Sequence, residues 1–143
     1  MPAPEINIES LKVLLVEDEF EALNLVKSML ISMGITQIYT AKNGVEALQF
    51  LGEFDCDELV NVILCDWNMP RMSGLELLKQ IRTVDPSIPF LMITGTADIS
   101  SVSDAKAAGV TAYIKKPFSQ DELKKKLMIL ARILAHRQAS ELI

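Results

Sequence analysis

The hydrophobic and polar positions of the 143-residue chain form short apolar runs that alternate with longer amphipathic segments. Unbroken apolar runs are typical of strands that are buried on both faces of a parallel sheet. The runs at 13–16, 60–65 and 90–93 have this form, and the more polar runs at 35–40 and 110–115 indicate two further strands. The pattern therefore predicts five strands.

Between these runs, apolar residues recur at helical spacing. They predict a helix from Glu19 to about Met33, closed by Gly34, and further helices at about 45–51, 75–85 and 99–108. Ser119 with Glu122 three residues later is a capping-box pattern that starts the last helix. Five strands and five helices in strict alternation predict a mostly parallel sheet with helices on both faces.

Composition indicates a single globular domain, since half of the residues are hydrophobic and 23% are charged. We expect one domain over 1–143, with its core at about 11–134, an N-terminal extension at 1–10 and an extension of the last helix at 135–143. The N-terminus lacks a signal-peptide pattern and no apolar run is long enough to span a bilayer, so a cytoplasmic location is expected. The net charge of −5 argues against direct binding to nucleic acid.

Three other features have simple interpretations. Cys56 and Cys65 do not have a metal-binding or redox spacing, and Cys65 is expected to be a small buried thiol. His136 is expected to be a solvated side chain. The last helix continues to about Ala139, which indicates a long surface helix, a contact in a weak homodimer or the start of a connector.

Polar residues follow four of the predicted strands. Glu17 and Asp18 follow the first strand, Asp66 the third, Thr94 the fourth and Lys116 the fifth. Because the carboxyl ends of parallel strands meet at one edge of the sheet, we expect these side chains to converge there. Scattered surface residues would show no such register with the strand ends.

The chemistry of such a site follows from its charges. Three carboxylates at one edge repel one another unless a hard divalent cation lies between them, and Mg²⁺ prefers oxygen ligands of this kind. Asp66 is placed to act as a nucleophile, because carboxylates can form acyl phosphates. Lys116 and Thr94 can contact phosphoryl oxygens. Positioning and charge neutralisation are nearly all that phosphoryl transfer requires of a protein.

Taken one by one, most of these residues allow a simpler interpretation. The acidic stretch from Glu17 to Glu19 could only favour the N-terminus of the next helix. Thr94 could be a turn residue, and Lys116 a solvated lysine. Asp66 lacks such an interpretation, because a carboxylate directly after four apolar strand residues requires a specific reason.

Independent enzymes with a similar element pattern are disfavoured. A flavodoxin needs a Ser/Thr/Gly-rich phosphate loop after the first strand, where Glu17, Asp18 and Glu19 would repel a phosphate. The glycine fingerprints of nucleotide-binding folds are absent. A phosphatase of the haloacid-dehalogenase type needs two aspartates after the first strand, and only Asp18 is available.

The strand-end motifs together resemble the receiver domains of bacterial response regulators, the CheY-like superfamily. The resemblance extends over roughly Leu11 to Leu134, and the motifs are Leu14–Glu19, Asp66–Pro70, Ile93–Gly95 and Lys116–Phe118. It implies an α/β, doubly wound, flavodoxin-like fold with strand order 2-1-3-4-5 and five helices on two faces. It also implies a signalling domain of two-component systems and not an enzyme.

Carried over by position, the resemblance implies that Asp66 is the phosphoacceptor. Glu17, Asp18 and Asp66 would hold Mg²⁺, together with the backbone carbonyl of Asn68. Glu17 stands where many members of the family have Asp, which implies a looser metal geometry. Asn68 and Thr96 would tune the hydrolysis rate of the acyl phosphate.

The resemblance also implies a switch. Thr94 and Lys116 would contact the phosphoryl group, with a cis bond before Pro117. Thr94 would move toward the phosphoryl group while Tyr113 turns inward, which alters the surface of the fourth helix, fifth strand and fifth helix. By pattern alone, Tyr113 could equally be a half-buried strand residue with a solvated hydroxyl.

The implied partners are a histidine kinase or a histidine phosphotransfer protein, and a downstream protein target. Two alternatives stay open. The chain could be a phosphorelay carrier that passes its phosphoryl group to a histidine phosphotransfer protein. It could also be a receiver module cut from a larger regulator with an output domain.

Overall fold

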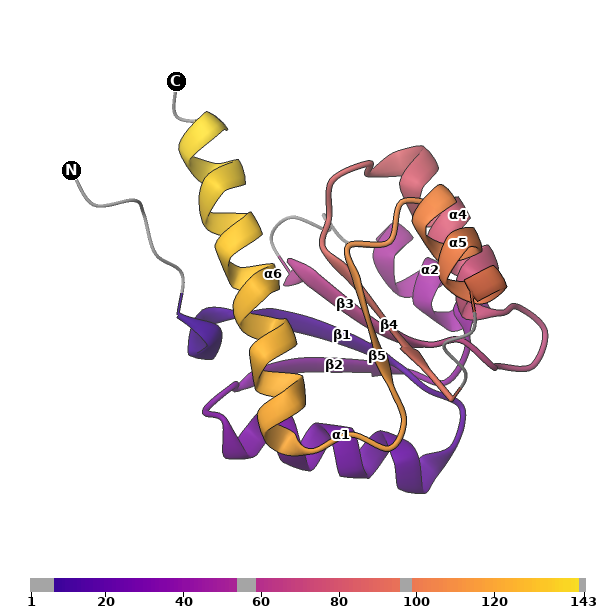
Figure 1. Ribbon diagram of the computed structural model, residues 1–143, viewed down its shortest axis with the longest axis horizontal. Coiled ribbons are helices and arrows are strands. Elements are labelled where there is room, and N and C mark those ends of the chain that lie inside the picture. Colours follow the sequence, from indigo (N-terminus) through magenta and orange to yellow (C-terminus); the bar gives the residue numbers. More distant parts are fainter. Residues whose placement is uncertain (1–6, 54–58, 96–98, 142–143) are drawn as a thin grey trace.

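The structure, a computed structural model, describes residues 7–53, 59–95 and 99–141. Its centre is a sheet of five parallel strands in the order β2-β1-β3-β4-β5, as predicted (Figure 1). The strands are β1 (Lys12–Val16), β2 (Gln37–Ala41), β3 (Val62–Asp66), β4 (Phe90–Thr94) and β5 (Ala112–Lys115).

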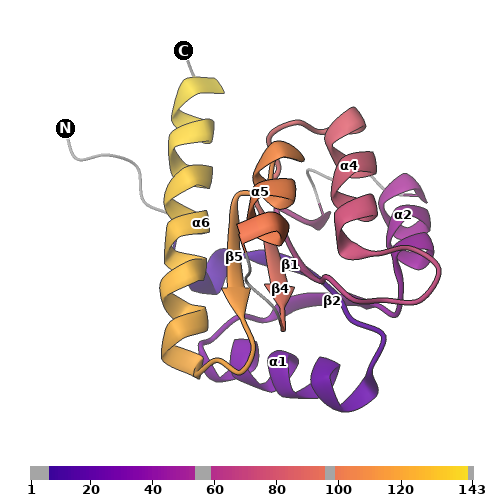
Figure 2. The same ribbon diagram turned by 45° about the vertical axis from the view of Figure 1, so that its right-hand side comes forward.

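Helices cover both faces of the sheet. They are α1 (Phe20–Ser32), α2 (Gly44–Glu53), α4 (Gly74–Val84), α5 (Ile99–Ala107) and α6 (Gln120–Glu141), preceded by the short 3₁₀ helix η1 (Ile8–Ser10). Helices α1 and α6 lie on one face, and α2, α4 and α5 lie on the other (Figures 1 and 2). Within the described residues this confirms the predicted arrangement, in which α5 and α6 are the fourth and fifth helices of the sequence analysis.

Strand β1 shows why the interior positions of the central strands are apolar. Side chains alternate between the two faces of a strand. Val13 and Leu15 therefore enter the core beneath α1 and α6, whereas Leu14 and Val16 enter the core beneath α2 and α4. All four are completely buried. Helices on both faces thus account for the continuous apolar run.

Strand boundaries differ slightly from the predicted ones. Val60 is buried but lies before β3, because the Asn61 side chain accepts a hydrogen bond from the backbone N–H of Lys12 at 2.8 Å where the sheet begins. At the other end, Asp66 and Thr94 are the last residues of β3 and β4 instead of the residues that follow them. The hydrophobic pattern reports burial and not strand pairing, so it misplaces such ends.

Helix α6 contacts η1 and packs against the same core as η1. Leu134 is buried in the core on the α1 side, and Ile8 of η1 packs against the same core. Ala135 is also buried. Arg137 also lies 4.0 Å from the Asp85 carboxylate. Packing within one chain thus explains part of the length of α6. The homodimer contact stays a prediction.

Two further predictions concern the cysteines and the membrane. Cys65 is a buried thiol, as predicted, and Cys56 lies outside the described residues. Within 7–53, 59–95 and 99–141, no helix combines the length and the apolar character that crossing a membrane requires.

Candidate functional site

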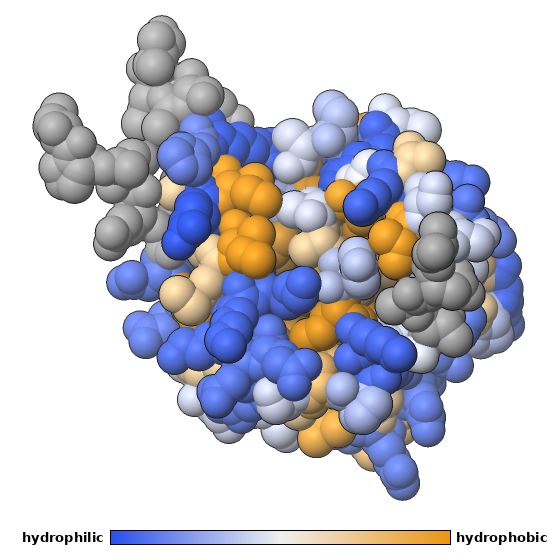
Figure 3. All heavy atoms as spheres, viewed as in Figure 1, coloured by the Kyte–Doolittle hydropathy of each residue, from blue (hydrophilic) through white to orange (hydrophobic). Residues whose placement is uncertain are grey.

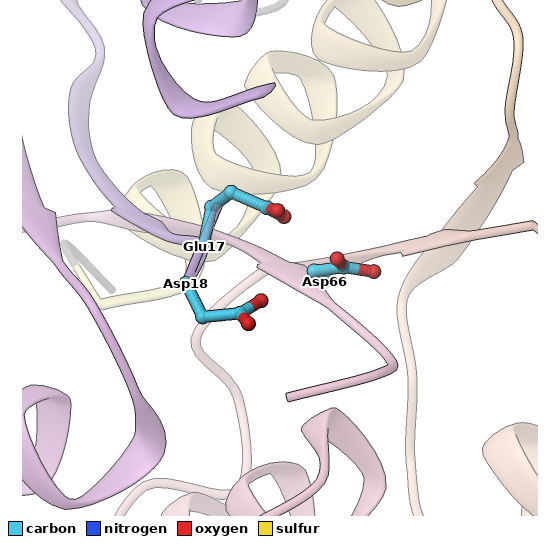
Figure 4. Close-up of side chains that lie close together, drawn as sticks. All are labelled: Glu17, Asp18 and Asp66. Carbon is cyan, nitrogen blue, oxygen red and sulfur yellow. The ribbon is translucent and has the colours of Figure 1, made fainter. Parts of the chain in front are cut away.

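Acidic side chains from two strands meet at the carboxyl edge of the sheet. Glu17 and Asp18 follow β1, and Asp66 ends β3. One carboxylate oxygen from each of the three lies within 4.8 Å of the others. Figure 4 shows Glu17 and Asp18 with their carboxyl groups turned toward Asp66. The convergence predicted from the strand ends is therefore present in the fold.

The three carboxylates are not equally buried. Glu17 is 4% exposed and Asp66 is 6% exposed, whereas Asp18 is exposed. The backbone N–H of Glu17 donates to the carbonyl of Ala41 at 3.0 Å, which holds the Glu17 backbone against the end of β2. The N–H of Glu19 approaches Glu17 Oε1 at 3.3 Å. Two carboxylates are thus held out of water, and the third faces solvent.

Lys116 supplies the opposite charge. Its Nζ lies 3.3 Å from Asp66 Oδ2 and 3.8 Å from Glu17 Oε2. Its backbone N–H donates to the carbonyl of Thr94 at 2.7 Å, which fixes the end of β5 against the end of β4. The peptide bond between Lys116 and Pro117 is cis, as the resemblance implies. One ammonium group therefore serves two buried carboxylates.

The crowding of negative charge is visible in the ionisation of Glu17. Burial, a hydrogen bond with Asp66 and repulsion by the Asp66 carboxylate raise the pKa of Glu17 from its ordinary value of 4.5 to about 8. Attraction by Lys116 acts in the opposite direction and is the weaker effect. Without a further cation, the site therefore favours a proton on Glu17 at neutral pH.

The other predicted residues that the structure describes lie at the end of β4, on β5 and in the loop after β3. Thr94 is 3% exposed at the end of β4, next to Asp66 in the sheet order. The Asn68 backbone N–H lies 3.4 Å from Asp66 Oδ1. Tyr113 is half-buried on β5, with Lys126 Nζ 5.6 Å from the centre of its ring. Thr96 lies outside the described residues. The roles of all these residues remain predictions.

Sequence reasoning missed the part played by Gly74, the first residue of α4. Its N–H donates to the carbonyl of Trp67 at 2.8 Å, so the helix starts close against the Asp66 backbone. A Cβ at this position would collide with the Asp66 carbonyl oxygen and would lie 2.9 Å from Met92 Sδ. A glycine opening a helix directly after the N-cap residue Ser73 is a signal of such close approach, since glycine is a poor helix former.

The donor set fits a hard divalent cation. Three carboxylates within 4.8 Å of one another offer oxygen ligands of the kind that Mg²⁺ prefers. Burial and the neighbouring Asp66 raise the pKa of Glu17, so its charged form is disfavoured without a further cation even though Lys116 is near. The residues present therefore match the chemistry of a magnesium site.

Comparisons with known proteins point the same way. Residues 13–128 match the model of the response regulator receiver domain family. The chemotaxis protein CheY-3 of Vibrio cholerae is 39% identical over 121 residues, covering 83% of this chain and 90% of that protein.

Solved structures agree with the sequence comparison. The chemotaxis protein CheY4 of Vibrio cholerae superimposes with a TM-score of 0.76 at 32% identity, covering 84% of this chain and 98% of that chain. The CheY of a CheX–CheY–BeF₃–Mg²⁺ complex from Borrelia burgdorferi gives a TM-score of 0.76 at 24% identity, covering 82% and 87%, and shares the fold. From its sheet order, its strand-end residues and these similarities, the chain belongs to the response regulator receiver domain family.

Proposed function

We propose that this receiver domain takes a phosphoryl group from the phosphohistidine of a histidine kinase or a histidine phosphotransfer protein onto Asp66. The observation that carries the proposal is the cluster of Asp66 with Glu17 and Asp18, with Lys116 Nζ 3.3 Å from the Asp66 carboxylate. In the reaction an Asp66 carboxylate oxygen bonds to phosphorus. The bond between phosphorus and the imidazole nitrogen breaks, and the imidazole keeps its electron pair.

Each neighbouring residue has a defined task in this proposal. Glu17 and Asp18 would hold Mg²⁺ together with Asp66 and the backbone carbonyl of Asn68. The bound ion supplies neutralisation of charge on the phosphoryl oxygens. Lys116 holds the Asp66 carboxylate in place and offers its ammonium group to a phosphoryl oxygen.

The buried surroundings of Asp66 favour transfer over hydrolysis of the product. Asp66 is only 6% exposed, and Thr94 beside it is 3% exposed. A largely enclosed carboxylate limits the access of water to an acyl phosphate. We propose that the Thr94 hydroxyl contacts the phosphoryl group and that Tyr113 responds by turning inward, which changes the surface of α5, β5 and α6 for a downstream protein.

The proposal is tested by incubating the protein with acetyl phosphate and Mg²⁺ and measuring its intact mass. We expect the wild type to gain one phosphoryl group and Asp66→Asn to gain none. Asp104→Asn, which changes an exposed aspartate on α5, should behave like the wild type. Omission of Mg²⁺ should prevent the gain in the wild type and in Asp104→Asn. A phosphoryl group that persists in Asp66→Asn would place the acceptor elsewhere.

A further inference from the structure

A pocket lies between α2 and α4, at the amino edge of the sheet. The two helices are neighbours on the same face of the sheet (Figures 1 and 2). The pocket has a volume of about 320 Å³, near the lower end of the range for ligand pockets, about 300–1,000 Å³. Its apolar lining consists of Leu48, Leu51, Ile63, Ile81, Val84 and Ile88. The pocket therefore has the size and lining of a small-molecule site, and it shares no residue with the Asp66 cluster.

Its concave shape distinguishes this pocket from exposed apolar residues elsewhere. On the face seen in Figure 3, orange side chains lie in small groups among blue ones. Such groups are normal on the surface of a folded protein. In the pocket, by contrast, Ile63 is completely buried and Ile81 and Ile88 are almost completely buried, whereas Val84 is 79% exposed. A ligand there would contact a buried floor and an exposed wall at once.

Asp85 gives the rim of the pocket a negative charge. Among the described residues that line the pocket, it is the one with a charged side chain. Its Oδ1 accepts from the backbone N–H groups of Ser87 at 2.9 Å and Ile88 at 3.0 Å. Burial raises the pKa of Asp85, but these hydrogen bonds and attraction by Arg137 lower it below its ordinary value of 3.8. The rim therefore has a carboxylate at neutral pH.

Both helices that form the pocket end at this rim. Helix α2 contributes Leu51 and Gly52 from its last turn, and α4 contributes Val84, its last residue. The carboxyl end of a helix has partial negative charge, which favours a cation nearby. Asp85 and the two helix ends therefore make the rim attractive for a positively charged group.

Two arginines lie near the rim but outside the pocket lining. Arg82 donates to the carbonyls of Gly109 at 2.9 Å and Ile88 at 2.7 Å. Arg137 Nη2 lies 4.0 Å from Asp85 Oδ2, which is longer than the about 2.7–2.9 Å of a charge-assisted hydrogen bond. A small ammonium group can therefore approach Oδ2 more closely than Arg137 does.

We infer that this pocket binds a small amphiphilic amine, with its apolar body against Ile63, Ile81 and Val84 and its ammonium group at the Asp85 carboxylate. An apolar cavity of about 150 Å³ binds benzene, so the larger pocket suits a bicyclic body. A primary amine is protonated at neutral pH, as the lysine side chain is. The apolar body would supply most of the affinity, and the ammonium group would supply the preference over neutral and anionic molecules.

The test uses three probes with the same bicyclic body: 2-(2-naphthyl)ethylamine, 2-(2-naphthyl)ethanol and 2-naphthylacetate. Each is titrated into the full chain at neutral pH and followed by ¹H–¹⁵N NMR. The amine should bind at least about threefold more tightly than the alcohol and at least about tenfold more tightly than the carboxylate. The shifted signals should belong mainly to the last turns of α2 and α4 and to Asp85. The preference for the amine should decrease as salt is raised.

Asp85→Asn isolates the contribution of charge, because the amide keeps an oxygen for the backbone donors. It should weaken binding of the amine at least about threefold and leave binding of the alcohol unchanged. Asp104→Asn makes the same change at an exposed aspartate of α5 outside the pocket and should leave the amine affinity unchanged.

Val84→Ser isolates the apolar contribution. It should weaken binding of all three probes by a similar factor, because each loses the same apolar contact. Val45→Ser makes the same change at an exposed valine of α2 outside the pocket lining and should have no effect on binding.

Several results would overturn the inference. They are a carboxylate or alcohol that binds as tightly as the amine, an amine preference that persists in Asp85→Asn, and shifted signals that lie away from α2 and α4. Absence of binding by all three probes would reject the pocket as a ligand site. These outcomes do not depend on Asp66, so the inference and the proposed function are tested separately.

Discussion

Both edges of the sheet hold charged side chains among buried residues. The two edges differ in how these charges are compensated by neighbouring groups. At the carboxyl edge, Glu17 and Asp66 share one lysine and compete for it. At the opposite edge, the hydrogen bonds of the Arg82 guanidinium on α4 to other described residues all go to oxygen acceptors. The guanidinium donates to the carbonyls of Gly109 at 2.9 Å, Asp85 at 3.2 Å and Ile88 at 2.7 Å.

The Arg82 contacts join four elements. Gly109 follows α5, Ile88 precedes β4, Asp85 follows α4 and Thr111 precedes β5. Arg82 Nη2 also lies 3.4 Å from the hydroxyl of Thr111, which itself accepts from the backbone N–H of Phe90 at 2.9 Å. Burial lowers the pKa of Arg82, but a guanidinium stays charged in proteins. One side chain therefore satisfies several carbonyls at once.

The difference shows that interactions that stabilise the fold and groups suited to a reaction lie at opposite edges of the sheet. At the Arg82 edge, each guanidinium contact satisfies a carbonyl or hydroxyl oxygen, so the interactions stabilise the fold. At the carboxyl edge, Glu17 is buried beside Asp66 although burial and the neighbouring carboxylate disfavour its charged form without a cation. Functional sites commonly have such unfavourable local arrangements. Variants at the two edges should therefore have opposite consequences.

The largest expected effect is the pH dependence that Glu17 introduces. Its pKa in the fold is about 8 and its ordinary value is 4.5, so between these pH values the folded protein holds a proton that the unfolded chain has lost. Stability without Mg²⁺ should therefore fall as pH rises through this window, by about 1 kcal/mol per pH unit. Urea unfolding at several pH values measures the slope.

Glu17→Gln is the matched control for this titration. Its stability should decline less than that of the wild type over the same window, because the amide does not ionise. Addition of Mg²⁺ should reduce the slope of the wild type, since a cation compensates the charged carboxylates. Parallel profiles of stability against pH for the wild type and Glu17→Gln would show that the titration of Glu17 does not cause the fall in stability.

Arg82→Met should destabilise the protein by about 3 kcal/mol, because three carbonyl groups lose a charged donor. Phosphorylation of the folded variant by acetyl phosphate should be unchanged, since Arg82 lies at the other edge of the sheet. Arg132→Met removes an exposed arginine of α6 and should cost less than about 0.5 kcal/mol. Urea unfolding and intact mass together test the prediction. Slower phosphorylation in Arg82→Met would contradict the prediction and would show that the contacts of Arg82 influence the site around Asp66.

Gly74→Ala should cost about 2 kcal/mol, because the added methyl group overpacks against the Asp66 backbone. It should also slow phosphorylation, since the displaced backbone is that of the acceptor residue. Gly52→Ala, at a helical glycine with open space around it, should be neutral or slightly stabilising. Thermal unfolding and a time course of intact mass separate the two effects. Wild-type phosphorylation in Gly74→Ala would remove its proposed positioning role.

The smallest effect is expected at Arg71, in the loop between β3 and α4. Among the described residues it is the one non-glycine with a positive φ, 69°, a region in which a side chain is strained. Arg71→Gly should stabilise the protein by about 0.5 kcal/mol, because relief of strain exceeds the added freedom of the unfolded chain. A melting temperature at or below that of the wild type would contradict this expectation.

Much of the site could be predicted from the sequence because its residues lie at strand ends. The apolar runs marked the strands, and parallel strands bring their carboxyl ends to one edge. Asp66 and Lys116 could therefore be placed together although they are separated by fifty residues. In contrast, adjacent Glu17 and Asp18 looked equivalent in the sequence, and only the fold shows that one is buried and the other exposed.

The sequence by itself determined the order and type of the elements and the residues at the carboxyl edge, because hydrophobic periodicity and strand ends are local properties. Only the tertiary structure decided the contacts of Arg82, the close approach of Gly74 to Asp66 and the packing of α6 and η1 against the same core. These depend on how segments distant in sequence pack against one another. Their positions follow from the packing of the whole core, which no local pattern encodes.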